Sequence, residues 1–234
     1  SPPMNSPNYF LMFDDDAWGY PQDQLEVWEF VVDWNNPSNS TFTKQGNIAT
    51  ASFDSDLCSA FRERCIDQPG TATKLEAIPD RLMHRAAYRN FGSYEAMVLN
   101  HTVDANGSGK AGIRWYELRS TGSSWSIYQQ GTFAPDNDHR WMGSIAMDQS
   151  GNIALGYSVS STTTYPSIRY AGRLATDPLG QLSQGEASLI AGGGSQTGSN
   201  RWGDYSMMSV DPTDDCTFWY TQEYYQTTSS RGWQ

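Results

Sequence analysis

The sequence predicts an all-β protein, and more specifically a β-propeller built from four-stranded antiparallel blades. Composition is the first observation behind this prediction. Aromatic residues make up 13% of the 234 residues, charged residues only 18%, and 21 residues are glycine, which is typical of strands joined by tight turns. The second observation is an internal repeat of about sixty residues, a spacing that indicates repeated supersecondary units such as propeller blades.

The clearest copies of the repeat are residues 143–159 and 203–224. Each copy begins with a strand led by glycine, turns at an aspartate (Asp148 or Asp211) and returns in a second strand with apolar or aromatic residues on one face. The same dipeptide precedes both copies, as Arg140-Trp141 and Arg201-Trp202. The shared layout predicts that the two segments occupy equivalent places in the fold.

Two weaker copies lie at residues 81–101 and 8–34. Together the four units predict a single domain over residues 1–234, with blades at 8–53, 80–133, 138–192 and 200–234 and an insertion at 54–79. Within that insertion, residues 56–64 are the one candidate for a short helix, with a loop as the alternative. Four blades close a ring with difficulty, and the chain stops at residue 234 soon after a strand, so we expect it to be part of a larger propeller.

Four motifs are long enough to carry a resemblance: residues 111–119 (AGIRWYELR), 139–161 (HRWMGSIAMDQSGNIALGYSVSS), 165–173 (YPSIRYAGR) and 200–224 (NRWGDYSMMSVDPTDDCTFWYTQEY). Together they resemble the C-terminal part of a secreted β-propeller-like domain of multidomain bacterial exoproteins, often found beside adhesion or carbohydrate-binding modules. The resemblance implies no particular activity. The chain is also loosely similar to the sialidase-like propeller superfamily, although the turn at Asp148 departs from the Asp-box pattern of those enzymes.

Charge narrows the class of partner. The net charge is −11, and nucleic acid and anionic membrane surfaces both require a basic footprint. The longest apolar runs are far shorter than a bilayer span, so we expect no membrane insertion. The partners that remain are a glycan, an extracellular protein, or the remaining blades of the same precursor or of another subunit.

The cysteines and lysines favour a secreted protein. Cys58 and Cys65 are spaced for a local disulfide rather than for a zinc site, whereas Cys216 lies in a strand-like pattern and is expected to be a small buried hydrophobe. Lysine is rare beside arginine, and no signal peptide is visible at residues 1–10. We interpret the chain as extracellular and as a processed piece of a longer precursor.

The candidate catalytic residues are arginines near the starts of the predicted inner strands, with their polar neighbours. They are Arg85, Arg140, Arg201, His139, Asp204 and Tyr205. Sialidases clamp a substrate carboxylate with three arginines and use a tyrosine nucleophile, and equivalent repeat positions should gather at one mouth of the propeller channel. The alternative is structural: the repeated arginine links neighbouring blades and the tryptophan after it packs between them.

Two further kinds of site are predicted in loops. Four aromatic residues could stack on sugar rings there: Trp18, Tyr20, Trp34 and Tyr165. The run Asp14, Asp15 and Asp16 could hold a structural calcium ion through its carboxylate oxygens, and a solvated acidic loop is the alternative.

The sequence therefore predicts a secreted binding or scaffolding module whose ligand is a glycan or an extracellular protein. Two alternatives remain open. One is a sialidase-like glycoside hydrolase or polysaccharide lyase acting at the channel mouth. The other is a self-assembling extracellular subunit with an unpaired sheet edge at its end.

Overall fold

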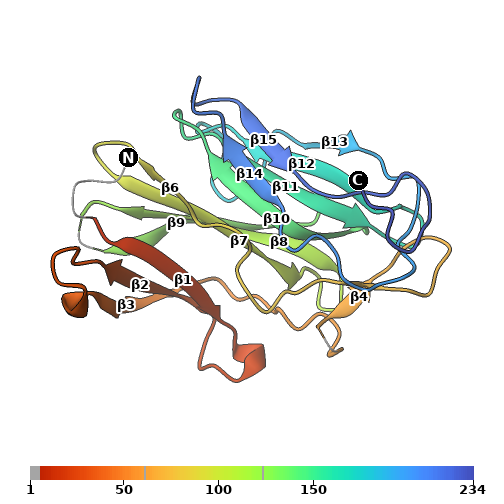
Figure 1. Ribbon diagram of the computed structural model, residues 1–234, viewed down its shortest axis with the longest axis horizontal. Helices are drawn as coiled ribbons and strands as arrows, with labels where there is room; N and C mark the ends of the chain where they lie inside the picture. Colours follow the sequence, from red (N-terminus) through yellow and green to blue (C-terminus); the bar gives the residue numbers. More distant parts are fainter. Residues whose placement is uncertain (1–5, 61, 123) are drawn as a thin grey trace.

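A computed structural model describes residues 6–60, 62–122 and 124–234, and this part of the chain is all-β (Figure 1). Two one-turn 3-10 helices, Asp16–Trp18 and Pro37–Asn39, are its helical elements. Within these described residues, no helix has the length and apolar character needed to cross a bilayer. The predicted all-β class is confirmed.

Four sheets follow one another along the chain, each antiparallel with its strands in sequential order. The first sheet contains β1 (Asn8–Asp14), β2 (Gln24–Val31) and β3 (Thr41–Ala49). The second contains β6 (Ala87–Asn90), β7 (Glu95–Asp104), β8 (Ala111–Ser120) and β9 (Trp125–Phe133). The third contains β10 (His139–Met147), β11 (Ile153–Ser160), β12 (Ser167–Arg173) and β13 (Glu186–Ile190). The fourth contains β14 (Met207–Val210) and β15 (Phe218–Thr221). A small extra sheet pairs β4 (Arg64–Ile66) with β5 (Leu75–Glu76). The predicted four-stranded antiparallel sheets are thus present in the second and third positions.

Successive sheets pack face to face, in the order of the chain (Figure 1). Strand β10 packs on β7 and β8, and β14 packs on β10. Strands β7, β8, β10 and β11 are buried over most of their length because a neighbouring sheet or segment covers each face. The first and second sheets share an apolar core that includes Phe13, Leu25, Met97, Leu99 and Tyr116.

Hydrogen bonds between neighbouring sheets repeat with the period of the sequence. The Ser144 hydroxyl donates to the carbonyl of His84 at 2.9 Å and accepts from the amide of Met208 at 2.8 Å. The Ser206 hydroxyl donates to the carbonyl of Met142 at 2.9 Å. Ser144 in β10 and Ser206 just before β14 therefore make equivalent hydrogen bonds to preceding segments of the chain, about sixty residues earlier.

The aspartate-led turns also repeat. The Asp148 carboxylate accepts from the amide of Asn152 at 2.9 Å, and Gly151 provides the positive φ of 82° that this turn requires. The Asp211 carboxylate accepts from the amide of Thr213 at 2.8 Å. Each aspartate uses its side chain to fold its own hairpin.

One of the two expectations for the cysteines is correct. Cys58 and Cys65 form the predicted disulfide, with a Cα–Cα distance of 6.2 Å. Cys216 is free and exposed, so the expectation of a buried cysteine is wrong. The reason is that Cys216 still belongs to the β14–β15 turn, where its amide donates to the Asp214 carboxylate at 2.9 Å, and the strand begins only at Phe218.

The candidate helix at 56–64 is a loop over the residues described there. Residue 61 lies outside the described residues. Ser59, Arg62 and Glu63 have positive φ angles of 51°, 55° and 49°, which a right-handed helix does not permit. The chain then enters β4 at Arg64.

Candidate functional site

The aromatic groove is a cavity of about 560 Å³ beside β1 and the turn that follows it. Its lining residues come from β1 and its turn, from residues shortly before β4 and from the segment before β6: Met12, Phe13, Asp15, Trp18, Tyr20, Ala60, Arg62, Glu63, Pro79 and Asp80. Two of the four predicted ligand-binding aromatics, Trp18 and Tyr20, therefore share one cavity.

A capped turn presents these two aromatic residues. Asp15 is the N-cap of the one-turn helix, and its carboxylate accepts from the amide of Ala17 at 2.8 Å. Gly19 ends the turn with a φ of 90°, a left-handed conformation that favours glycine. The short sequence from Asp15 to Gly19 thus reverses the chain and leaves Trp18 and Tyr20 at the surface.

The Trp18 indole is held in place at its polar edge. Its Nε1 donates to the Ser55 hydroxyl at 2.7 Å, and the buried Asp15 carboxylate accepts from the Ser55 amide, also at 2.7 Å. Trp18 nevertheless remains 47% exposed, and Tyr20 45% exposed. A fixed ring with an open face loses little entropy when a ligand stacks on it.

Charged groups lie within the same groove. Asp80 is exposed and pairs with Arg81 at 2.7 Å, and Arg62 pairs with the buried Glu76 at 3.1 Å. Burial raises the pKa of Glu63, whose carboxylate accepts from the amide of Cys58. The groove therefore combines aromatic faces with hydrogen-bonding groups at its rim, which suits a ligand that is apolar on one face and polar at its edges.

The acidic turn contributes a group of three carboxylates. Asp15, Asp16 and Asp23 offer oxygens within 4.8 Å of one another, so the structure groups Asp23 with two residues of the predicted calcium set. The third, Asp14, accepts instead from the side-chain amide of Gln24 at 2.6 Å.

The carboxylates of Asp15 and Asp23 already have protein donors. Asp23 accepts from the amide of Asp16 at 3.0 Å and from the amide of Phe53 at 2.8 Å. These bonds close the turn without an ion, and calcium binding here stays a prediction.

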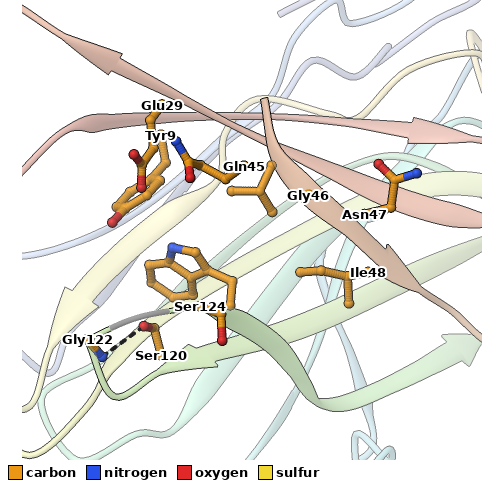
Figure 2. Close-up of a pocket in the computed structure, with 11 residues that line it drawn as sticks. Tyr9, Glu29, Gln45, Gly46, Asn47, Ile48, Ser120, Gly122 and Ser124 are labelled. Atoms are coloured by element: carbon orange, nitrogen blue, oxygen red, sulfur yellow. Dashed lines mark hydrogen bonds between the residues drawn. The ribbon is translucent and has the colours of Figure 1, made fainter. Parts of the chain in front are cut away.

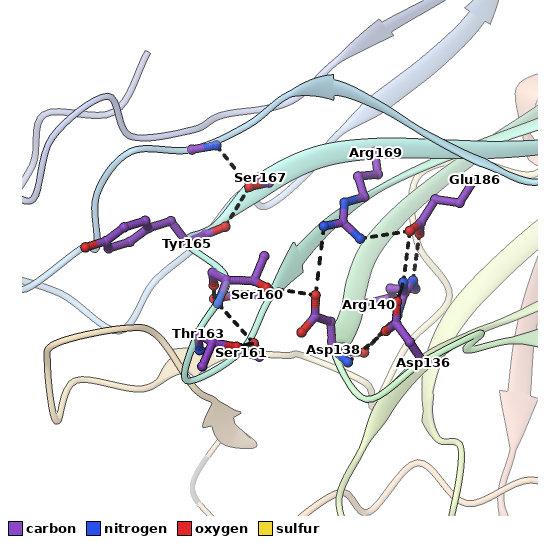
Figure 3. Close-up of polar contacts among 12 residues, drawn as sticks. Asp136, Asp138, Arg140, Ser160, Ser161, Thr163, Tyr165, Ser167, Arg169 and Glu186 are labelled. Atoms are coloured by element: carbon purple, nitrogen blue, oxygen red, sulfur yellow. Dashed lines mark hydrogen bonds and ion pairs between the residues drawn. The ribbon is translucent and has the colours of Figure 1, made fainter.

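Arg140 belongs to a polar cluster on the third sheet, together with Asp136, Asp138, Arg169 and Glu186 (Figure 3). Its fully buried guanidinium contacts Asp136 at 2.7 Å and Glu186 at 2.8 Å. Glu186 also pairs with Arg169 at 2.8 Å. Arg140 therefore links the loop before β10 to the start of β13, across its own sheet.

Arg201 is in a different environment. Its side chain is 56% exposed, pairs with Asp204 and lies 3.5 Å from Glu76. Tyr205 is 49% exposed and lines the same region as Asp204. Arg201, Asp204 and Tyr205 are thus brought together, whereas Arg140 has other partners among the described residues.

The remaining predicted residues are dispersed. His139 accepts from the amide of Ala111 at 3.2 Å, and burial lowers its pKa. Arg85 is exposed. Trp34 is 87% exposed beside the second 3-10 helix, and Tyr165 points away from the polar cluster of the third sheet (Figure 3).

A second groove, of about 280 Å³, lies between the first and second sheets (Figure 2). Tyr9 and Trp125 meet edge to face there, with ring centroids 5.2 Å apart. The sequence does not single out these two residues, because an aromatic residue within a strand has the same sequence pattern whether its strand lines a groove or a core.

No protein-family model, curated protein or solved structure matches this chain. The aromatic groove and the Arg201 region are thus interpreted from their own chemistry.

Proposed function

We propose that this protein is a secreted glycan-binding module whose four stacked sheets are blades of a β-propeller. The observation that carries the binding proposal is the pair of exposed rings, Trp18 and Tyr20, that line one groove. The C–H faces of sugar rings pack on aromatic faces, while their hydroxyls need donors and acceptors at the edge. Asp80 and Arg62 provide such groups.

Several features support the propeller assignment. The sheets follow the chain order, each is antiparallel, and hydrogen bonds between neighbouring sheets recur with a period of about sixty residues. The Cys58–Cys65 disulfide supports an extracellular location, since disulfides persist in oxidising compartments.

An exposed aromatic face on the first sheet supports a protein partner as well. Phe10 and Phe42 are 46% and 54% exposed, and their ring centroids lie 5.4 Å apart. Trp28 stacks on Phe42 at 5.2 Å. Such a face suits packing against a further blade. Sedimentation of the wild-type protein and of Phe42→Ser tests whether this face binds a second copy. Self-association of the wild type together with a monomeric variant would support the interface. A wild type that is monomeric at all concentrations would count against self-association.

Glycan binding is tested by a glycan array followed by calorimetry with the best ligand. We expect Trp18→Ala to weaken binding at least about tenfold, which is about 1.4 kcal/mol. Trp34→Ala is the matched control, because this tryptophan is more exposed but lies outside the groove. Wild-type protein that binds no glycan, or Trp18→Ala protein that binds as tightly as wild type, would refute the proposal.

A further inference from the structure

The C-terminal cleft lies between the 201–205 segment and the residues that follow β15. It consists of two cavities of about 300 and 270 Å³. Gly203, Asp204, Glu223 and Trp233 line both of them, so the two cavities adjoin. The cleft is separate from the aromatic groove, with which it shares no lining residue.

Two carboxyl groups in this cleft have opposite surroundings. Asp204 forms an ion pair with Arg201. Glu223 forms no ion pair with any Lys, Arg or His of the described residues. Burial raises its pKa against a hydrogen bond from the Gly203 backbone, and the negative charge of Asp204 raises it further.

Glu76 shows how another carboxyl group of this protein is compensated by positive charge, as Glu223 is not. Glu76 is almost fully buried, and Arg62, Arg64 and Arg201 all approach it. A carboxylate in that setting stabilises the fold as an ion. Glu223 lines an open cleft and forms no ion pair with an arginine of the described residues. Such surroundings suit a carboxyl group that donates a proton.

Aromatic surfaces complete the cleft. Trp233 and Tyr205 are 60% and 49% exposed. Trp202 is buried and lines the first cavity with Trp233, and its Nε1 donates to the Ser158 hydroxyl at 2.9 Å, which fixes one wall. A sugar ring could therefore stack on an exposed aromatic face while its glycosidic oxygen lies near the two carboxyl groups.

We propose that the C-terminal cleft hydrolyses O-glycosidic bonds, with Glu223 as the acid and Asp204 as the base. This activity goes beyond glycan binding at the aromatic groove and does not depend on it. Arg231 also lines the cleft and could pair with an acidic sugar, so uronic acid glycosides belong in the substrate set.

The proposed reaction balances without a cofactor. The Glu223 carboxyl group gives its proton to the glycosidic oxygen, the bond from that oxygen to the anomeric carbon breaks, and the electron pair leaves with the departing alcohol. Water adds to the anomeric carbon and transfers a proton to Asp204. A proton then passes through solvent from Asp204 to Glu223, which restores both groups.

The test uses the full chain and a panel of 4-methylumbelliferyl α- and β-glycosides of hexoses, N-acetylhexosamines and uronic acids. We expect turnover of at least one member, and a loss of about 100-fold or more in Glu223→Gln and in Asp204→Asn. Glu29→Gln on the first sheet is the matched control and should keep the wild-type rate. Thermal unfolding of each variant shows whether it is folded.

A leaving-group comparison separates an acid from a residue that merely supports the fold. A 2,4-dinitrophenyl glycoside of the same sugar departs without protonation, so Glu223→Gln should lose less than about tenfold on it. The activity of the wild-type protein should also fall as pH rises through the raised pKa of Glu223. Absence of turnover of every panel member overturns the proposal, as does an equal loss on both leaving groups. Failure of glycan binding at Trp18 affects only the aromatic groove.

Discussion

The Arg140-Trp141 pair in β10 and the Arg201-Trp202 pair before β14 are identical in sequence, but only their tryptophans have the same role. Trp141 and Trp202 are both buried, with ring centroids 6.0 Å apart in one apolar cluster. Arg140 is fully buried within a set of ion pairs, whereas Arg201 is 56% exposed at the edge of a cleft. The two tryptophans therefore belong to one apolar cluster, while the acids that lie near each arginine determine what that arginine does.

The largest effect on stability is expected from replacing the two buried tryptophans, which the two Arg-Trp pairs have in common. Trp141→Ala and Trp202→Ala should each lower the free energy of unfolding by about 3–5 kcal/mol, because each leaves a large cavity in the apolar cluster that the two rings share with the 54–79 insertion. Denaturant unfolding measures this. The double variant should lose less than the sum, because the two rings pack in the same cluster. A loss below about 1 kcal/mol for either single variant would contradict the equivalence of the two tryptophans.

Replacing the two arginines should change the free energy of unfolding by clearly different amounts. Arg140→Ala should cost about 3 kcal/mol, because it leaves Glu186 partly buried with Arg169 as its remaining ion-pair partner. Arg201→Ala should cost less than about 1 kcal/mol, because the Arg201 side chain is 56% exposed and Glu76 keeps Arg62 and Arg64. The same unfolding experiment compares them. Equal losses in the two variants would show that the arginines have one common structural role.

These contrasts show which features of the fold could be predicted from the sequence. Period-two patterning and aspartate turns predicted the all-β sheets, because both are local properties of the chain. The spacing of Cys58 and Cys65 predicted their disulfide. The partners of Arg140 could not be predicted, because Glu186 is brought to it only when β13 joins the third sheet.

The residues of the candidate sites also differ in whether the sequence could predict them. Trp18 and Tyr20 were predictable because one short turn contains both residues. Glu223 and Trp233 were not, since only tertiary contact places them beside Asp204.

A finer contrast concerns the indole nitrogens. Trp202 Nε1 donates to the Ser158 hydroxyl at 2.9 Å, whereas Trp141 Nε1 has no hydrogen-bond partner among the described residues. Trp202→Phe should therefore cost about 1 kcal/mol more than Trp141→Phe in denaturant unfolding. Adding Ser158→Ala to Trp202→Phe should recover part of the difference, because it removes the hydroxyl left without its donor. Equal costs for the two phenylalanine variants would show that this hydrogen bond contributes nothing net.

The smallest effect is the pH dependence of the Arg140 contribution. Hydrogen bonds from Arg140 lower the pKa of Asp136 to about 2. Burial opposes ionisation of Glu186, yet hydrogen bonds from Arg140 and Tyr157 lower its pKa as well. For an acid whose pKa is lower in the folded state, the stabilisation is present above the unfolded pKa, about 4, and is lost as pH falls through the folded value.

We therefore expect the stability gap between the wild-type protein and Arg140→Ala to narrow between about pH 4.5 and pH 2. The change should stay below about 1 kcal/mol, because the Asp136 side chain is 50% exposed and solvent screens its charge. Denaturant unfolding at pH 5, 3.5 and 2.5 measures the gap. The gap between wild type and Trp141→Phe is the control and should stay constant, because neither residue titrates. If the stability difference between wild type and Arg140→Ala does not change with pH, the guanidinium stabilises the third sheet by packing and neutral hydrogen bonds alone. The two Arg-Trp pairs would then differ in burial rather than in charge.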